Sequence, residues 1–95
     1  MSITAATLLI VDDEPLVRKL LKMLLEDQGY LTLTASSGEE ALAIVEQQPP
    51  DLILLDIMMP GMDGYEVASQ LKGNPATANI PIIMLSALSE SSARV

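Results

Sequence analysis

Short apolar runs alternate along the chain with longer amphipathic segments, and this alternation restricts the possible folds more than any other feature. The runs cover residues 7–11, 30–35, 52–55 and 80–85, and their lengths suit strands. Three of them are almost continuously apolar, which predicts strands buried on both faces, whereas the run at 30–35 alternates. Buried strands separated by helices predict an α/β fold with a doubly wound parallel sheet.

The segments between the runs are predicted to be helices. In residues 15–28, apolar side chains recur every four residues, and basic and acidic side chains cover the other side. The apolar residues are Leu16, Leu20 and Leu24, joined by Val17, Leu21 and Leu25, and the polar ones are Arg18, Lys19, Lys22 and Glu26. A second helix is expected after Ser37, a suitable cap, and a third over residues 65–72. Residues 1–95 form one small domain.

Charge and composition exclude several classes of function. Thirteen acidic residues against five basic ones give a net charge of −8, so we expect no direct contact with nucleic acid or with an anionic membrane. The chain has no cysteine, which excludes disulfides and thiolate metal sites. No secretory signal is recognised, and the apolar runs are too short to cross a bilayer, so a cytoplasmic location is predicted.

Polar side chains follow three of the predicted strands. Asp12 and Asp13 come after the first, Asp56 after the third and Ser86 after the fourth. Because the carboxyl ends of parallel strands share one edge of the sheet, these side chains are expected to converge. Carboxylates about 4 Å apart repel by roughly 4 kcal/mol at an effective dielectric near 20, unless a cation lies among them. Oxygen ligands favour Mg²⁺, and Mn²⁺ or Ca²⁺ could substitute.

Each of these residues also has a structural interpretation. Asp13 and Glu14 could cap the helix that follows them, and Ser86 could bond local backbone. Asp56 is harder to explain this way, because an ionisable group inside an apolar run is unfavourable without a partner. Met58 and its neighbouring methionines are expected to pack rather than to bind a ligand through sulfur.

Three motifs together resemble the response-regulator receiver domain of two-component signalling. They are LLIVDDEP at 8–15, LLDIMMPGMDGYE at 54–66 and PIIMLSA at 81–87. The resemblance implies a flavodoxin-like sheet with strand order 2-1-3-4. It also implies a Mg²⁺ site made by the side chains of Asp13 and Asp56, the backbone carbonyl of Met58 and, through a water molecule, Asp12.

The resemblance further implies what the site does. Asp56 would accept a phosphoryl group from a phosphohistidine on a sensor histidine kinase or a histidine phosphotransfer protein. Ser86 would contact a phosphoryl oxygen and act in a conformational switch, and Ala87 would leave space for the phosphate. Such a module phosphorylates itself and is not a turnover enzyme.

The sequence also departs from the receiver pattern. Receivers continue into a fifth strand that ends in a lysine, and this chain has only Lys19, Lys22 and Lys72, all on predicted helices. The domain is therefore expected to be truncated, with its fourth strand at an edge that self-associates or binds missing polypeptide. Two alternatives stay open: an interaction or dimerisation module without phosphotransfer, and a phosphatase that uses an aspartate nucleophile.

Overall fold

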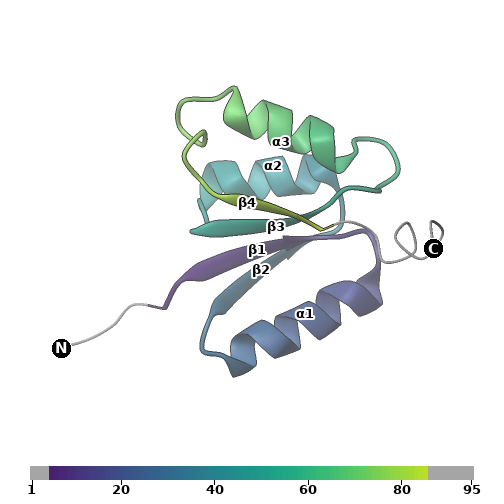
Figure 1. Cartoon of the computed structure of the whole chain (residues 1–95), viewed down its shortest axis with the longest axis vertical. Helices are drawn as coiled ribbons and strands as arrows, with labels where there is room; N and C mark the ends of the chain where they lie inside the picture. The colour runs from purple at the N-terminus through teal and green to yellow at the C-terminus, as the bar shows by residue number, and fades with distance from the viewer. Residues whose placement is uncertain (1–4, 86–95) are drawn as a thin grey trace.

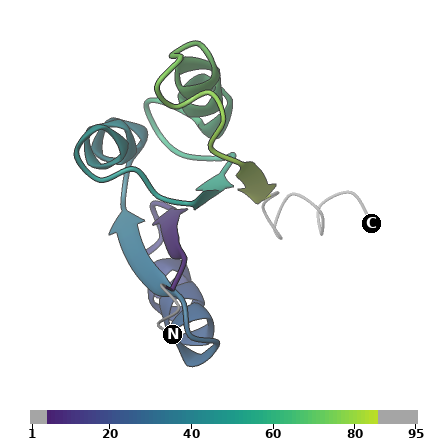
Figure 2. The same cartoon turned by 90° about the vertical axis from the view of Figure 1, so that its left-hand side faces the viewer.

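The computed structural model describes residues 5–85, which form four strands and three helices in strict alternation. The strands are β1 (Thr7–Val11), β2 (Leu31–Ala35), β3 (Leu52–Asp56) and β4 (Ile82–Leu85), and the helices are α1 (Pro15–Asp27), α2 (Gly38–Gln47) and α3 (Gly64–Lys72). Figure 1 shows α1 on one face of the sheet and α2 and α3 on the other, and Figure 2 shows the same layers from the side. The predicted α/β class is confirmed.

All four strands are parallel, in the order β2-β1-β3-β4. This is the predicted order, with β1 and β3 at the centre. The register of the central pair sets Val11 of β1 beside Leu55 of β3. The residues that follow, Asp12 and Asp56, therefore leave the sheet next to each other.

The main core lies between the sheet and the α2–α3 layer. Its strand residues include Leu9, Val11, Ile53 and Leu55, all fully buried. The helices contribute four further buried residues: Ala41, Val45, Val67 and Leu71. The apolar runs of the sequence thus become the centre of the domain, as predicted, and they fix the strand ends that carry the acids.

The two apolar rows of α1 have different surroundings. Val17, Leu21 and Leu25 are half-buried on the side of α1 that packs on β1 and β2, whereas the parallel row is exposed. In that row Leu16 is 75% exposed, Leu20 55% and Leu24 56%. The prediction of one apolar face was wrong for this row, because one straight helix on a sheet buries only a narrow stripe.

The last strand starts two residues later than predicted. The peptide N–H of Ile80 donates to the carbonyl of Thr77, so residue 80 belongs to the turn. Pro81 has no N–H for a ladder, and β4 begins after it. Lys72 closes the turn by donating from Nζ to the carbonyls of Ala78 (3.0 Å) and Ile80 (3.1 Å).

Within residues 5–85, β4 is an edge strand, as predicted, and the side chain of Ile83 is 48% exposed. Self-association through this edge stays a prediction. In the same part of the chain, no helix is both long enough and apolar enough to span a membrane.

The burial pattern predicts very different costs for one substitution at two strand positions. Ile53→Ala removes a fully buried side chain at the centre of the sheet and should destabilise the domain by about 3 kcal/mol. Ile83→Ala, on the half-exposed edge, should cost less than about 1 kcal/mol. Urea unfolding of both variants measures the two values, and equal losses would contradict the assignment of the core.

Candidate functional site

Three carboxylates meet at the carboxyl ends of the two central strands. Asp12, Asp13 and Asp56 each offer one oxygen, and these oxygens all lie within 4.8 Å of one another. Asp12 and Asp56 are buried, with 6% and 8% of their surface exposed, whereas Asp13 is open to solvent. The convergence predicted for these three residues is therefore present in the fold.

The backbone between β1 and α1 is fixed by hydrogen bonds on both sides of Asp12. Its N–H donates to the carbonyl of Ala35 (3.1 Å), which continues the β1–β2 pairing by one residue. Its Oδ1 accepts from the N–H of Glu14 (2.9 Å), and its carbonyl accepts from Arg18 (2.8 Å). Glu14 is the N-cap of α1 but makes no side-chain cap bond, so the capping interpretation is not supported for this residue.

The loop after β3 turns sharply around Asp56. Oδ1 of Asp56 accepts from the N–H of Met58 (3.2 Å), and Gly64 at the start of α3 donates to the carbonyl of Ile57 (3.0 Å). A Cβ at Gly64 would overlap the carbonyl oxygen of Asp56 and lie 2.8 Å from the Cα of Ile57. Only glycine permits this close approach, which holds the backbone of the acid against α3.

The start of α3 is fixed by a reciprocal capping box. The side chain of Asp63 accepts from the N–H of Glu66 (2.9 Å), and the side chain of Glu66 accepts from the N–H of Asp63 (3.2 Å). Together with Gly64, this anchors the far end of the loop that follows Asp56.

Electrostatics in the cluster oppose three negative charges. Burial is the main cause that raises the pKa of Asp56 to about 6, and the negative charge of Asp12 adds to it, while the Met58 hydrogen bond acts in the opposite direction. Burial also raises the pKa of Asp12. At 4.8 Å each pair of carboxylates repels by about 3 kcal/mol at an effective dielectric near 20.

These residues fit a hard divalent cation. The donor set consists of oxygens alone, it projects from separate strand ends, and one of the three carboxylates is open to solvent. Mg²⁺ is commonly held by one or two carboxylates and keeps several water molecules, so three converging carboxylates suffice. A cation would also offset the repulsion by Asp12 that, after burial, adds to the raised pKa of Asp56.

The other predicted site residues have different outcomes. Ser86 and Ala87 lie outside the described residues. Met58 is 59% exposed, so the expectation that it packs was wrong, whereas its neighbour Met59 is buried. No lysine bonds the acids of the cluster: Lys22 bonds Glu26 and Thr32, Lys72 bonds the turn before β4, and the side chain of Lys19 is exposed on α1.

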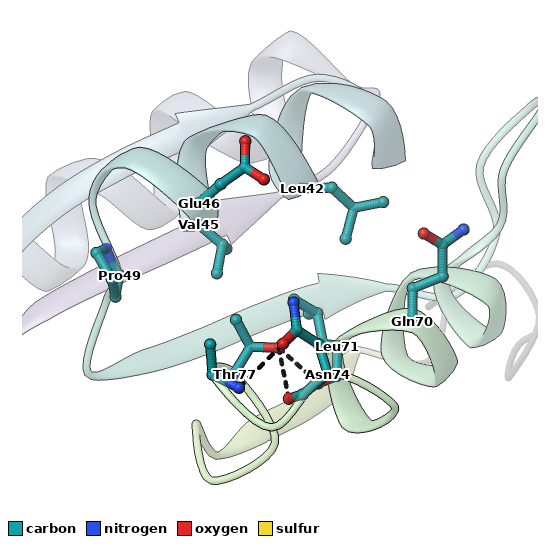
Figure 3. A pocket seen from close by; sticks show the side chains of 9 residues that line it. Leu42, Val45, Glu46, Pro49, Gln70, Leu71, Asn74 and Thr77 are labelled. Carbon is teal, nitrogen blue, oxygen red and sulfur yellow. Dashed lines mark hydrogen bonds between the residues drawn. The ribbon is translucent and has the colours of Figure 1, made fainter.

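The cavity of about 260 Å³ found in this fold is separate from the acids. It lies between α2 and α3 and the turn after α3, where Leu42, Glu46 and Asn74 line it (Figure 3). The buried Thr77 hydroxyl, which lines it, donates to the carbonyl of Leu71 (2.6 Å; Figure 3). Among residues 5–85, no buried side-chain nitrogen or oxygen lacks a hydrogen-bond partner. The candidate site therefore lies outside this cavity, at the strand ends, with two buried acids and one that is open to solvent.

Sequence reasoning missed one contributor to the site. Arg18 was placed on the polar side of α1, yet its Nη1 donates to the carbonyl of Asp12. No pattern in the sequence distinguishes it from the adjacent Lys19, because both occupy polar positions of the same helical turn. The sequence indicates this contact only by the spacing of six residues between Asp12 and Arg18. That spacing can be interpreted only when the path of the β1–α1 turn is known.

Comparison with known proteins matches residues 8–95 to the response regulator receiver domain family. A probable transcriptional regulator ycf27 of Guillardia theta is 46% identical over 92 residues, which are 97% of this chain and 35% of that protein. The phosphate regulon transcriptional regulatory protein PhoB of Pseudomonas aeruginosa is 45% identical over 89 residues, 94% of this chain and 39% of that protein. The chain therefore spans little more than a third of these relatives.

Solved structures show the same similarity. The N-terminal domain of a response regulator receiver protein from Methanoculleus marisnigri superimposes with a TM-score of 0.85 at 42% identity, over 95% of this chain and 76% of that one. The Vibrio cholerae chemotaxis protein CheY4 gives a TM-score of 0.82 at 30% identity, over 94% and 77%.

The raised pKa of Asp56 predicts a pH-dependent loss of stability in the metal-free protein. Between pH 3.8 and about 6 the folded chain binds more protons at this residue than the unfolded chain, so stability falls as the pH rises through this interval. Asp56→Asn should therefore stabilise the protein at pH 7, by up to about 3 kcal/mol, and the gain should nearly vanish at pH 4. Urea unfolding in EDTA at several pH values measures it. A gain that is the same at every pH would contradict the raised pKa.

Proposed function

The chain belongs to the response regulator receiver domain family, and from this premise we propose that it accepts a phosphoryl group on Asp56 in a Mg²⁺-dependent reaction. The observation that carries the proposal is the buried carboxylate of Asp56, which ends β3 within 4.8 Å of two other acids. In two-component signalling the phosphoryl group would come from a phosphohistidine, and its arrival would act as a conformational switch.

The residues have distinct proposed roles around the cation. Asp13 and Asp56 would bind Mg²⁺ through their side chains and Met58 through its backbone carbonyl. Asp12 is held by its own bonds to the backbone and would act through a water molecule. When bound, Mg²⁺ supplies positive charge that favours the approach of an anionic phosphoryl group to the acids.

Asp56 is suited to act as the attacking group. Its pKa of about 6 leaves it mostly ionised at neutral pH, and one oxygen is fixed by the N–H of Met58. The other oxygen would form a bond to phosphorus while the nitrogen–phosphorus bond of the phosphohistidine breaks. Because the carboxylate is anchored at a strand end and by the loop to α3, its orientation is set before the donor arrives.

Ser86 and Ala87 complete the proposal from the sequence alone. Ser86 would donate a hydrogen bond to a phosphoryl oxygen, and Ala87 would leave space for that group. The donor protein would be a sensor histidine kinase or a histidine phosphotransfer protein, and the reaction would take place in the cytoplasm. These roles stay predictions.

One alternative function has a specific observation in its favour. Ile83 is half-exposed on the edge strand β4, which suits an interaction module that pairs through this edge. The phosphatase alternative has less support, because a general acid is needed two residues after the nucleophile and the thioether of Met58 occupies that position.

Incubation with Mg²⁺ and acetyl phosphate, followed by intact mass measurement, tests the proposal. We expect a gain of one phosphoryl group in the native chain and none in Asp56→Asn. Asp51→Asn is the matched control, since Asp51 lies at the opposite end of β3 and its side chain accepts a hydrogen bond from the N–H of Thr7, away from the cluster. EDTA should abolish the gain in mass.

Two results would contradict the proposal: an equal adduct on Asp56→Asn, or no adduct on a native chain that binds Mg²⁺. In the first case the phosphoryl group would reside elsewhere. In the second, the chain would act as the interaction module.

A further inference from the structure

Arg18 reaches from α1 back to the end of β1. It lies one turn into the helix, is half-buried, and donates from Nη1 to the carbonyl oxygen of Asp12 at 2.8 Å. The adjacent Lys19 is exposed, and no hydrogen bond or ion pair is recorded for its side chain among residues 5–85. The two neighbouring cations therefore have different surroundings on the same helical turn.

The guanidinium also lies close to the start of α2. Bonds from the backbone and hydroxyl of Ser36 lower the pKa of Glu40, and the positive charge of Arg18 adds to this effect. The same charge lowers the pKa of Asp12, against the larger effect of burial. Arg18 is thus bonded to the end of β1, and its charge acts on the acids Asp12 and Glu40.

The charge of Arg18 has two opposite effects at the acid cluster. The positive charge attracts the ionised acids in the metal-free protein, but it repels any metal ion that binds among them. A half-buried arginine is also more difficult to desolvate than an apolar side chain. Its hydrogen bond to the carbonyl of Asp12 is a contribution of a different kind, because it acts on the backbone of the turn.

We propose that Arg18 is a positioning residue for the cation site, which holds the turn between β1 and α1 so that Asp12 and Asp13 point toward Asp56. This inference rests on the proposed function, because it concerns the same Mg²⁺ site. Three bonds define the turn: the N–H of Asp12 to β2, its Oδ1 to the next turn, and its carbonyl to Arg18. The first ties Asp12 to β2 and the second lies within the turn, whereas the third joins Asp12 to a side chain of α1.

Positioning and electrostatics predict opposite changes in Mg²⁺ affinity. If Arg18 acted only through its charge, replacing it with a neutral residue would strengthen Mg²⁺ binding, because a repulsive charge is removed. If it positions the turn, the same replacement weakens binding, since the carboxylates must then be ordered at the expense of binding energy. The direction of the change therefore decides between the two roles.

The test uses Arg18→Met, which keeps an unbranched apolar stem but has neither the donor nor the charge. Lys19→Met is the matched control, because it removes the same charge from the adjacent position. Calorimetric titration with Mg²⁺ at pH 7 gives the affinities, and thermal unfolding shows that each variant is folded. We expect Mg²⁺ to bind Arg18→Met about tenfold more weakly than the native chain. For Lys19→Met we expect a change of at most about twofold.

A second variant separates geometry from charge where Arg18→Met fails to fold. Arg18→Lys keeps the positive charge but not the planar guanidinium, so weaker Mg²⁺ binding in this variant supports positioning. Unchanged or stronger binding in the folded variants would overturn the inference. A native chain that binds no Mg²⁺ would instead contradict the proposed function, so the two failures can be told apart.

Discussion

The parallel pairing of β1 with β3 is the constraint on which the candidate site depends. With Val11 beside Leu55, two chain segments more than forty residues apart in the sequence end at the same level of the sheet. Asp12 and Asp56, which follow these two residues, therefore lie close together. A shift of this register by one residue would reverse the faces of the buried side chains, so the core that stabilises the strands also fixes the positions of the carboxylates.

The site is thus stabilised by a core that tolerates unfavourable charges at its edge. Leu9, Ile53 and Leu55 are fully buried, and their burial offsets the repulsion among the acids. The loop after β3 completes the arrangement, because Gly64 allows α3 to contact the backbone of Asp56. In this account the acids are poorly suited to the metal-free state and well suited to a bound cation.

Much of this arrangement could be predicted from the sequence. The alternating runs predicted a parallel sheet, and the resemblance to receiver domains implied its strand order. The acids at the strand ends predicted the cluster, because the carboxyl ends of parallel strands share one edge. The helix at 65–72 was predicted to start one residue late, because glycine is a poor helix former. Gly64 begins the helix because its lack of a Cβ permits the close contact with the backbone of Asp56.

The exposure of side chains on α1 and the contact of Arg18 depend on tertiary packing, which no local sequence pattern predicts. Leu20 and Leu21 are both apolar, and only the position of α1 on the sheet leaves the first exposed and the second half-buried. The contact of Arg18 with the carbonyl of Asp12 likewise depends on the angle at which α1 leaves the β1 turn. Composition and periodicity are the same for either outcome, so the sequence could not distinguish them.

The central claim is that one cation binds where the ends of β1 and β3 meet. Paramagnetic broadening of backbone amide signals by substoichiometric Mn²⁺ tests it most directly. We expect broadening to be strongest at amides beside the ends of β1 and β3, such as those of residues 12–14 and 56–58, to fall off with distance from them, and to be reversed by excess Mg²⁺. Broadening spread evenly over exposed acids such as Asp27, Glu39 and Glu46 would contradict the claim, since it would show only the general attraction of cations to an acidic protein.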